Sequence, residues 1–233
     1  MLPINLDTVF EDAFKNEVIP FAKKLGFRRK HHRFYRKLND IFQCFDVQKN
    51  VYNSHFEYVS FTFNIGFFNQ AIWNIVRNDD GVASFPTTLQ CFIRGRLGAI
   101  AHQKDYWYEL KQDGKTAEVV SQMKSDIENH LLPFFEKYDT FDGLANIVEE
   151  FKGFHYSGNI HTGIAFLMLT GQIEKGKKVL TECFHQAQEP KIVTNSTRHP
   201  DGRVETKIVR TYINHALIET IKKIADLYKI ELT

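Results

Sequence analysis

One stretch in the first third of the chain alternates so strictly that it admits little besides a β-strand. In HFEYVSFTFNIGF, residues 55–67, apolar and polar side chains exchange at nearly every position from Tyr58 onward. Successive side chains of a strand point to opposite faces of a sheet. The pattern therefore predicts a strand with an apolar face and a polar face. The apolar face carries Val59, Phe61, Phe63, Ile65 and Phe67, and the polar face carries Tyr58, Ser60, Thr62 and Asn64.

Three more segments show strand-like alternation. Residues 32–38 and 41–49 are separated by Asn39 and Asp40, a tight-turn signal, and LQCFIRGRLGAI spans residues 89–100. In this last segment Arg94 and Arg96 fall on the side opposite Ile93 and Leu97. Short connections between consecutive strands favour an antiparallel meander. We therefore expect a sheet of about four strands.

Helical spacing of apolar residues flanks these strands. An apolar stripe runs from Leu6 to Leu25 and stops at Gly26, and a 3.6-residue period resumes at Thr116 with Pro133 bending the end of that helix. Later segments predict a short helix near 144–151, two helices joined at Gly171, and a last helix over 205–228. The segment 189–202, with its PDG turn signal, is expected to be a loop or a small hairpin.

This order predicts an α+β fold: an N-terminal helix, an antiparallel sheet, then C-terminal helices. We place an α+β domain at residues 1–150 and a helical region at residues 151–233, packed on the first as one unit. A chain of 233 residues with 43 % hydrophobic and 25 % charged residues is typical of globular proteins. The net charge of +2 implies no polyanionic partner.

The cysteines, the N-terminal segment and the apolar runs mainly exclude certain classes of protein. The three cysteines show no CxxC spacing, so neither a zinc site nor a disulfide framework is predicted, and we expect small buried side chains in a reducing compartment. The N-terminus does not look like a signal peptide, and no apolar run approaches the ~20 residues of a membrane span. We expect a cytoplasmic protein without membrane contact.

Two sequence features suggest a functional site at first sight, but neither one supports it. GQIEKGKK imitates a phosphate loop, but Lys178 stands where a metal-binding hydroxyl belongs, and the context is helical. The ten histidines include no HExxH or paired ligand spacing, and no GxSxG nucleophile motif is present. The sequence therefore predicts no metal, no cofactor and no assigned catalytic residue.

The basic stretch FRRKHHRFYRK, residues 27–37, raises the possibility of nucleic-acid binding. A nucleic-acid-binding surface needs its cationic side chains on one contiguous face. The alternation instead turns Arg33 and Lys37 away from Arg36 and leaves residues 28–30 in the preceding loop. We favour a solvated strand whose cations oppose edge-to-edge pairing.

The most informative feature is CFIRGRLGAIAHQKDYWYEL, residues 91–110. Two arginines on one strand face, followed closely by three aromatic rings, suit an anionic or planar ligand or a protein interface. The alternative is that a later helix covers this face and that the arginines pair with Glu109 or Glu118. The candidate binding residues are Arg94, Arg96, Tyr58, Asn64, Trp107 and Tyr108.

Several ordered motifs resemble a known family. They are KKLGFRRKHHRFYRK, FEYVSFTFNIGFF, CFIRGRLG, DYWYEL and HLLPFFEKYDTFDGL, which together span roughly Leu6 to Glu150. The chain resembles the domain of unknown function 4304 family, found in bacteria. The resemblance implies an α+β domain and a bacterial source, and it implies no activity, cofactor or catalytic residue.

Three functional hypotheses follow. The leading one is a non-enzymatic module that binds another protein or a small anionic or planar ligand, such as an accessory or immunity-type protein. The second is an enzyme with a dispersed site that uses His102, Asp105 or Tyr108 near Arg94 and Arg96. The third is nucleic-acid binding through residues 28–37.

Overall fold

The computed structural model describes residues 3–77, 81, 85–156, 160–198 and 203–232. The chain forms two compact units, Met1–Phe166 and Leu167–Thr233. The division between these units falls within helix α9 (Ile160–Leu169). Within the described residues, no helix combines the length and the apolar character needed to cross a membrane.

The described part of the first unit contains a seven-stranded antiparallel sheet. The longest strand, β4 (Tyr58–Phe68), pairs with β3 (Ile41–Lys49) along one edge. Two short strands share its other edge: β5 (Ile93–Arg96) and β6 (Tyr108–Lys111). The remaining strands are β1 (Arg28–Lys30), β2 (Arg33–Leu38) and β7 (His155–Tyr156). The α+β class and the antiparallel sheet are confirmed, with more strands than the four expected.

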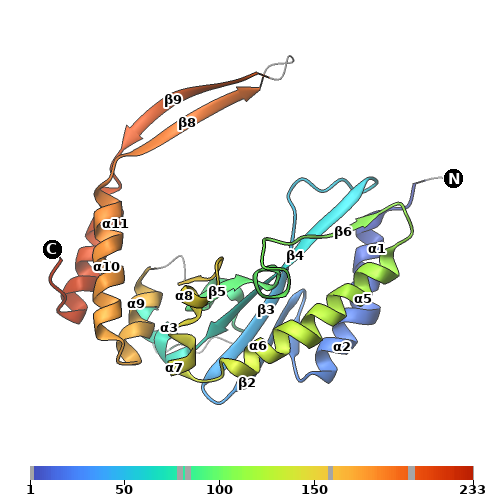
Figure 1. Ribbon diagram of the computed structural model, residues 1–233, viewed down its shortest axis with the longest axis horizontal. Helices are drawn as coiled ribbons and strands as arrows, with labels where there is room; N and C mark the ends of the chain where they lie inside the picture. Colours follow the sequence, from blue (N-terminus) through green and yellow to red (C-terminus); the bar gives the residue numbers. More distant parts are fainter. Residues whose placement is uncertain (1–2, 78–80, 82–84, 157–159, 199–202, 233) are drawn as a thin grey trace. The chain divides into compact units, whose positions relative to one another are not determined.

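The apolar face of β4 lies as the alternation predicts. Its five apolar side chains, from Val59 to Phe67, are at most 1 % exposed. Two long helical segments cover this face (Figure 1): α1 (Leu6–Ala13), η1 (Phe14–Val18) and α2 (Ile19–Lys24), then α5 (Thr116–Asp126), η3 (Ile127–Leu131) and α6 (Leu132–Lys137). Ring contacts connect them to the sheet. The ring centroids of Phe10 and Phe61 are 4.9 Å apart, and those of Phe135 and Phe67 are 5.4 Å apart. The Phe-rich core therefore lies between the sheet and these helices.

Each of these helical segments contains a π-helical turn that ends two residues before a proline. Phe14–Val18 precedes Pro20, and Ile127–Leu131 precedes Pro133. Proline has no N–H and its ring clashes with the carbonyl four residues earlier. A wider π turn absorbs that mismatch within the helix. Both segments therefore continue past their prolines.

The segment 89–100 is only partly the strand that its sequence predicted. Residues 88–90 form a 3-10 turn, η2, and Leu97–Ala101 form the short helix α4. The strand is limited to four residues because β6 occupies the edge of β4 further along. Gly98 lies so close to the backbone nitrogen of Tyr106 that a Cβ would approach it to 2.7 Å. The chain therefore leaves the sheet at Leu97.

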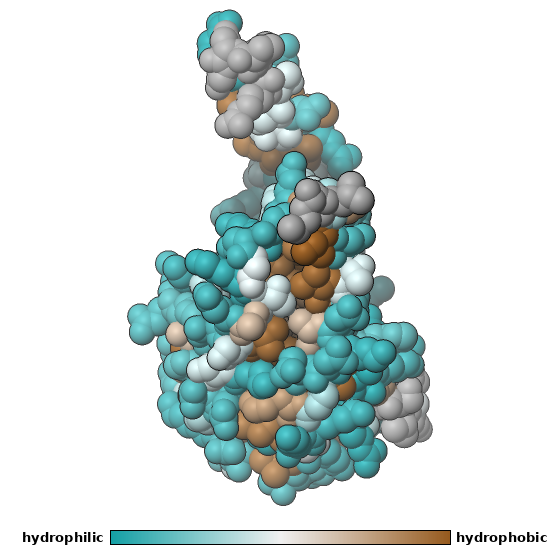
Figure 2. Space-filling model, turned by 90° about the vertical axis from the view of Figure 1, so that its right-hand side faces the viewer, coloured by the Kyte–Doolittle hydropathy of each residue, from teal (hydrophilic) through white to brown (hydrophobic). Residues whose placement is uncertain are grey.

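The remaining helices of the first unit are short. They are α3 (Gln70–Arg77), α7 (Phe141–Leu144) and α8 (Ile147–Glu150), and α9 follows them at the boundary. Figure 2 looks onto the end of this unit where α1 begins, and brown side chains form patches there on a mostly teal surface. Gln112 donates hydrogen bonds to the carbonyl oxygens of Ile4 and Phe56, both more than half exposed, and so ties these apolar residues together at that end.

The second unit contains two helices and a hairpin. Helix α10 (Ile173–Gln188) follows Gly171, whose φ of +73° ends the preceding helix as expected, and it packs on α11 (His215–Tyr228). The prediction of a helix from residue 205 is wrong, because Val204–Tyr212 form strand β9, paired with β8 (Lys191–Arg198). Three of its nine residues are Val or Ile and two are Thr, and these β-branched residues favour strands. The PDG turn signal lies outside the described residues.

Candidate ligand-binding site

A pocket of about 770 Å³ opens on the polar face of the sheet in the first unit. Its walls come from β3, β4 and β5, from η2, from α4 and the loop after it, and from the segment leading into β7. The polar and charged side chains that matter for its chemistry are Gln48, Asn64, Arg94, Arg96, Asp105 and His155.

The strand register explains how Arg94 and Arg96 come to face this pocket. Arg96 lies opposite Asn64 of β4, and Arg94 lies opposite Gly66 on one side and His155 of β7 on the other. Residues directly opposite one another in an antiparallel pair share a sheet face. Ile93, which precedes Arg94, is buried and points to the other face, and Gly95 between the arginines has no side chain and lines the pocket with its backbone.

Arg94 is held at one edge of its guanidinium and open at the other. Its Nε donates a hydrogen bond to Nε2 of His155 at 2.9 Å. Because Nε2 accepts, the proton of the neutral ring is assigned to Nδ1. The pKa of His155 is lowered, first by partial removal of the ring from water and second by the charge of Arg94. Within the described part of the chain, the Nη atoms of Arg94 donate to no protein group.

Arg96 is used differently. Its Nη1 lies 2.6 Å from both carboxylate oxygens of Asp105, and its guanidinium carbon lies 4.9 Å from the ring centroid of Trp107. The indole Nε1 of Trp107 also donates to Asp105 at 3.2 Å. Partial burial acts to raise the pKa of Asp105, but the hydrogen bonds from Arg96 and Trp107 lower it overall. The charge of Arg96 is therefore largely compensated within the protein.

A hydrogen-bonded chain forms the polar floor of the pocket. The amide nitrogen of Asn64 donates to Oδ1 of Asp46 at 3.0 Å and to Oε1 of Gln48 at 3.2 Å. The hydroxyl of Thr88 donates to the other oxygen of Asp46. Both oxygens of Asp46 thus accept a hydrogen bond from the protein, and the orientation of Asn64 is set.

Two lysines add positive charge at the rim. Lys104 and Lys152 line the pocket, are exposed, and form no ion pair with any described residue. The Nζ of Lys104 lies 5.9 Å from the ring centroid of Tyr106, which is a weak contact at best. Together with the free edge of Arg94, these lysines give the pocket an excess of positive charge.

The structure brings together four of the six candidate binding residues. Arg94, Arg96 and Asn64 line the pocket, and Trp107 stacks on Arg96. Tyr58 is on the same face of β4, but six residues along a strand from Asn64 correspond to roughly 20 Å. Its hydroxyl donates to the carbonyl oxygen of Tyr52.

Tyr108 lies on the opposite face of the sheet from the one expected. It pairs directly with Phe61 of the apolar face and is 3 % exposed. Its hydroxyl donates to Oδ2 of Asp126 at 2.6 Å, and burial followed by this bond raises the pKa of Tyr108. The sequence could not show this, because the register of β6 on β4 decides the face.

Several other residues that line the pocket carry no signal in the sequence. His155, Lys152 and Gln48 come from segments far from Arg94 in the chain, and no local pattern marks them. The arginines were expected to pair with Glu109 or Glu118 if a helix covered them. Arg96 pairs with Asp105 instead, and Arg94 with His155.

Asp126 organises a second, separate polar cluster. This carboxylate is 1 % exposed, and it lies 2.8 Å from Nε2 of His102 and accepts from Tyr108 and from Gln122 at 2.7 Å. His102 and Tyr108 therefore converge on Asp126, whereas Asp105 contacts Arg96. The three residues of the dispersed enzyme hypothesis do not meet at one point.

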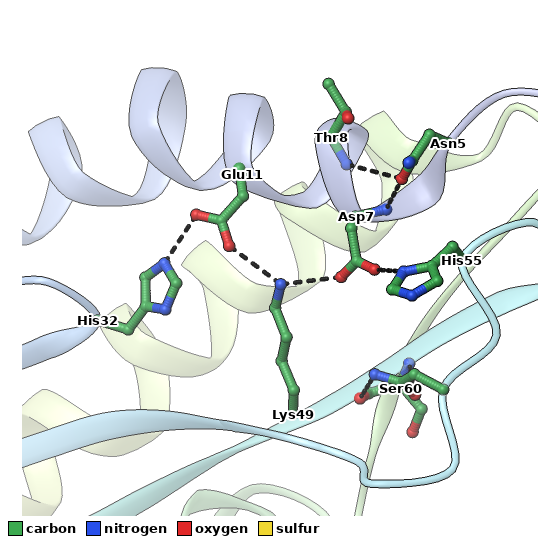
Figure 3. Close-up of polar contacts among 9 residues, drawn as sticks. Asn5, Asp7, Thr8, Glu11, His32, Lys49, His55 and Ser60 are labelled. Atoms are coloured by element: carbon green, nitrogen blue, oxygen red, sulfur yellow. Dashed lines mark hydrogen bonds and ion pairs between the residues drawn. The ribbon is translucent and has the colours of Figure 1, made fainter.

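A third cluster holds α1 against the sheet (Figure 3). Lys49 of β3 lies 3.0 Å from a carboxylate oxygen of Asp7 and 3.0 Å from one of Glu11. His55 pairs with Asp7, and Nε2 of His32 lies 2.9 Å from Glu11. Because the ammonium group of Lys49 occupies the space between the acids, this arrangement is an ion-pair network that fastens a helix.

The basic stretch does not form one surface. Residues 28–30 are not a loop but the exposed edge strand β1. Arg36 turns inward, where its Nε donates to Gln43 at 2.6 Å and its guanidinium lies 5.0 Å from the ring of Phe27. Arg33 and Lys37 lie on the other face of β2, as the alternation predicts.

Cysteines and other possible metal ligands form no obvious centre. Cys44 and Cys91 are buried free thiols in contact with each other, and burial followed by that contact raises the pKa of Cys91. Cys183 is half-buried. Among the residues that the structure describes, no group of three or more His, Cys, Asp or Glu side chains could hold a metal ion.

Comparison with known proteins shows the family to which the chain belongs. No curated protein and no solved structure matches the chain. The family described as Domain of unknown function (DUF4304) matches residues 18–137, which include strands β1 to β6, helix α2 and the helical segment from α5 to α6. This range lies within the 6–150 span that carries the sequence resemblance and covers more than half of the chain. The chain therefore belongs to the Domain of unknown function (DUF4304) family.

Proposed function

We propose that this protein is a binding module that takes a small organic anion in the Arg94 pocket. One observation carries the proposal. Arg94 lines a pocket of about 770 Å³ with its Nε fixed by His155 and both Nη atoms unpaired among the described residues. Pockets of roughly 300–1,000 Å³ are typical sites for small molecules.

The surrounding contacts favour a binding role. An arginine held at Nε presents its two Nη atoms as a preformed fork, and such forks suit carboxylates and phosphates. The other charged groups of the floor and wall, Asp46, Arg96 and Asp105, already have protein partners. An incoming anion would therefore meet Arg94 without having to break an internal ion pair.

The same contacts favour binding over catalysis. His155 is the candidate base at this pocket, but its Nε2 accepts a hydrogen bond from Arg94, and the proton of the neutral ring is then on Nδ1. A general base needs a free nitrogen within hydrogen-bond reach of the substrate. Binding of an anion does not require a general base.

Titration of the full chain with 1-anilinonaphthalene-8-sulfonate, an aromatic monoanion, tests the proposal. We expect saturable binding that Arg94→Ala weakens by about tenfold or more, because hydrogen bonds to charged groups contribute roughly 1.5–3 kcal/mol. Arg28→Ala on the exposed edge strand is the matched control and should leave the affinity unchanged. Arg94→Lys keeps the charge without the fork and should give an intermediate affinity.

Thermal unfolding of each variant shows whether the fold survives. Equal affinity of Arg94→Ala and the unaltered protein, with both folded, would reject the pocket as the binding site.

A further inference from the structure

We infer that the anionic group of the ligand is a phosphate monoester, carried on an apolar body. This inference rests on the proposed function and adds the ligand class. It comes from the number of uncompensated charges, from the geometry of Arg94, and from the mixed lining of the pocket.

The charge count favours a dianion. Three cations at the pocket have no ion-pair partner among the described residues: Arg94, Lys104 and Lys152. The carboxylate that lines the pocket, Asp105, is engaged by Arg96 and Trp107. A carboxylate ligand would neutralise one of the three charges, whereas a phosphate monoester carries about two negative charges at neutral pH.

The arrangement of donors also suits a tetrahedral group. The Nη fork of Arg94 can bind two oxygens, which leaves a third oxygen for another donor. Lys152 and Gly153 line the pocket three and two residues before His155, which holds Arg94. Lys152 therefore belongs to the same pocket-lining segment as the residue that orients the guanidinium.

The rest of the pocket is not built for an inorganic ion. Leu89 lines it with 72 % of its side chain exposed, and Ala99 and Gly95 add apolar surface. A volume of about 770 Å³ far exceeds what a single phosphate fills.

Isothermal titration of the full chain with phenyl phosphate, benzoate and inorganic phosphate tests this inference. The measurement is made at about pH 8, where a phosphate with a second pKa of about 6 is a dianion. We expect phenyl phosphate to bind about tenfold or more tightly than either of the others. Lys152→Gln should weaken phenyl phosphate more than benzoate, and Lys15→Gln on the surface of η1 is the control.

The outcomes separate the two proposals. Benzoate binding as tightly as phenyl phosphate, with both lost in Arg94→Ala, would overturn the phosphate assignment and leave the anion site in place. Inorganic phosphate binding as tightly as phenyl phosphate would overturn the apolar body. Absence of binding by all three probes and by the anilinonaphthalene sulfonate would overturn both proposals.

Discussion

Nε of Arg94 donates a hydrogen bond to Nε2 of His155 at 2.9 Å, between residues that lie directly opposite one another on β5 and β7. The acceptor nitrogen must carry a lone pair, so this bond exists only while the imidazole is neutral. Protonation would also place a second positive charge beside the guanidinium. The orientation of the Arg94 side chain therefore depends on the charge state of His155.

This link predicts a loss of stability in mild acid. The pKa of His155 is lowered from 6.5 in the folded protein, so the unfolded chain takes up the proton first. The contribution of His155 is present above about pH 6.5 and is lost as the pH falls through the lowered pKa. Urea unfolding across this range should show a shallower decline for His155→Gln than for the unaltered protein. His130→Gln, at an exposed position of η3, is the control.

Asp126→Asn should destabilise the first unit strongly. The carboxylate is buried and receives hydrogen bonds from Tyr108 and Gln122, with His102 at 2.8 Å. An amide in its place removes the charge and turns a donor toward groups that need an acceptor. We expect the free energy of unfolding to fall by about 3 kcal/mol. Asp12→Asn, exposed on α1, should change it by less than about 0.5 kcal/mol. Equal effects of the two variants would show that the Asp126 cluster contributes little.

The Lys49 network predicts a second, more acidic transition. Partial burial acts to raise the pKa values of Asp7 and Glu11, but the hydrogen bonds from Lys49 and the neighbouring histidines lower both below their ordinary 3.8 and 4.5. Their contribution to stability is therefore present above those ordinary values and is lost as the pH falls through the lowered ones. Lys49→Met should cost about 1 kcal/mol near neutral pH, because the groups are partly exposed, and should flatten this acid limb. Lys15→Met serves as control; an acid limb as steep in Lys49→Met as in the control would contradict the assignment.

Gly66→Ala tests the close packing under the pocket. A Cβ at Gly66 would lie 2.8 Å from Cβ of Cys91 and 2.8 Å from the carbonyl oxygen of Ile93. One of these contacts is to backbone, so relief requires β4 and β5 to separate. We expect a loss of about 1–3 kcal/mol in the free energy of unfolding. Gly143→Ala in α7, where the nearest atom is 3.4 Å away, should be close to neutral or stabilising. Similar stabilities of the two variants would contradict the packing argument.

The sequence alone determined the elements whose pattern is local. The two faces of β4 follow from strict alternation. The helices that begin at Leu6 and Thr116 follow from apolar stripes, because each stripe lies within a single helix and can be recognised without knowing its partner. The prediction of a helix over 205–212 is wrong because apolar residues there also fit a helical spacing, whereas the β-branched residues and the pairing with β8 make the segment a strand.

Only the tertiary structure decided which side chains share the pocket. The face of Tyr108 depends on the register of β6, and the partners of Arg94 and Arg96 come from β7 and from the loop after α4. Pairing between strands is a choice among distant segments, and a shift of one residue would turn every side chain to the other face. The sequence could therefore place two arginines on a polar face, but it could not say that one is compensated by Asp105 while the other keeps an open edge.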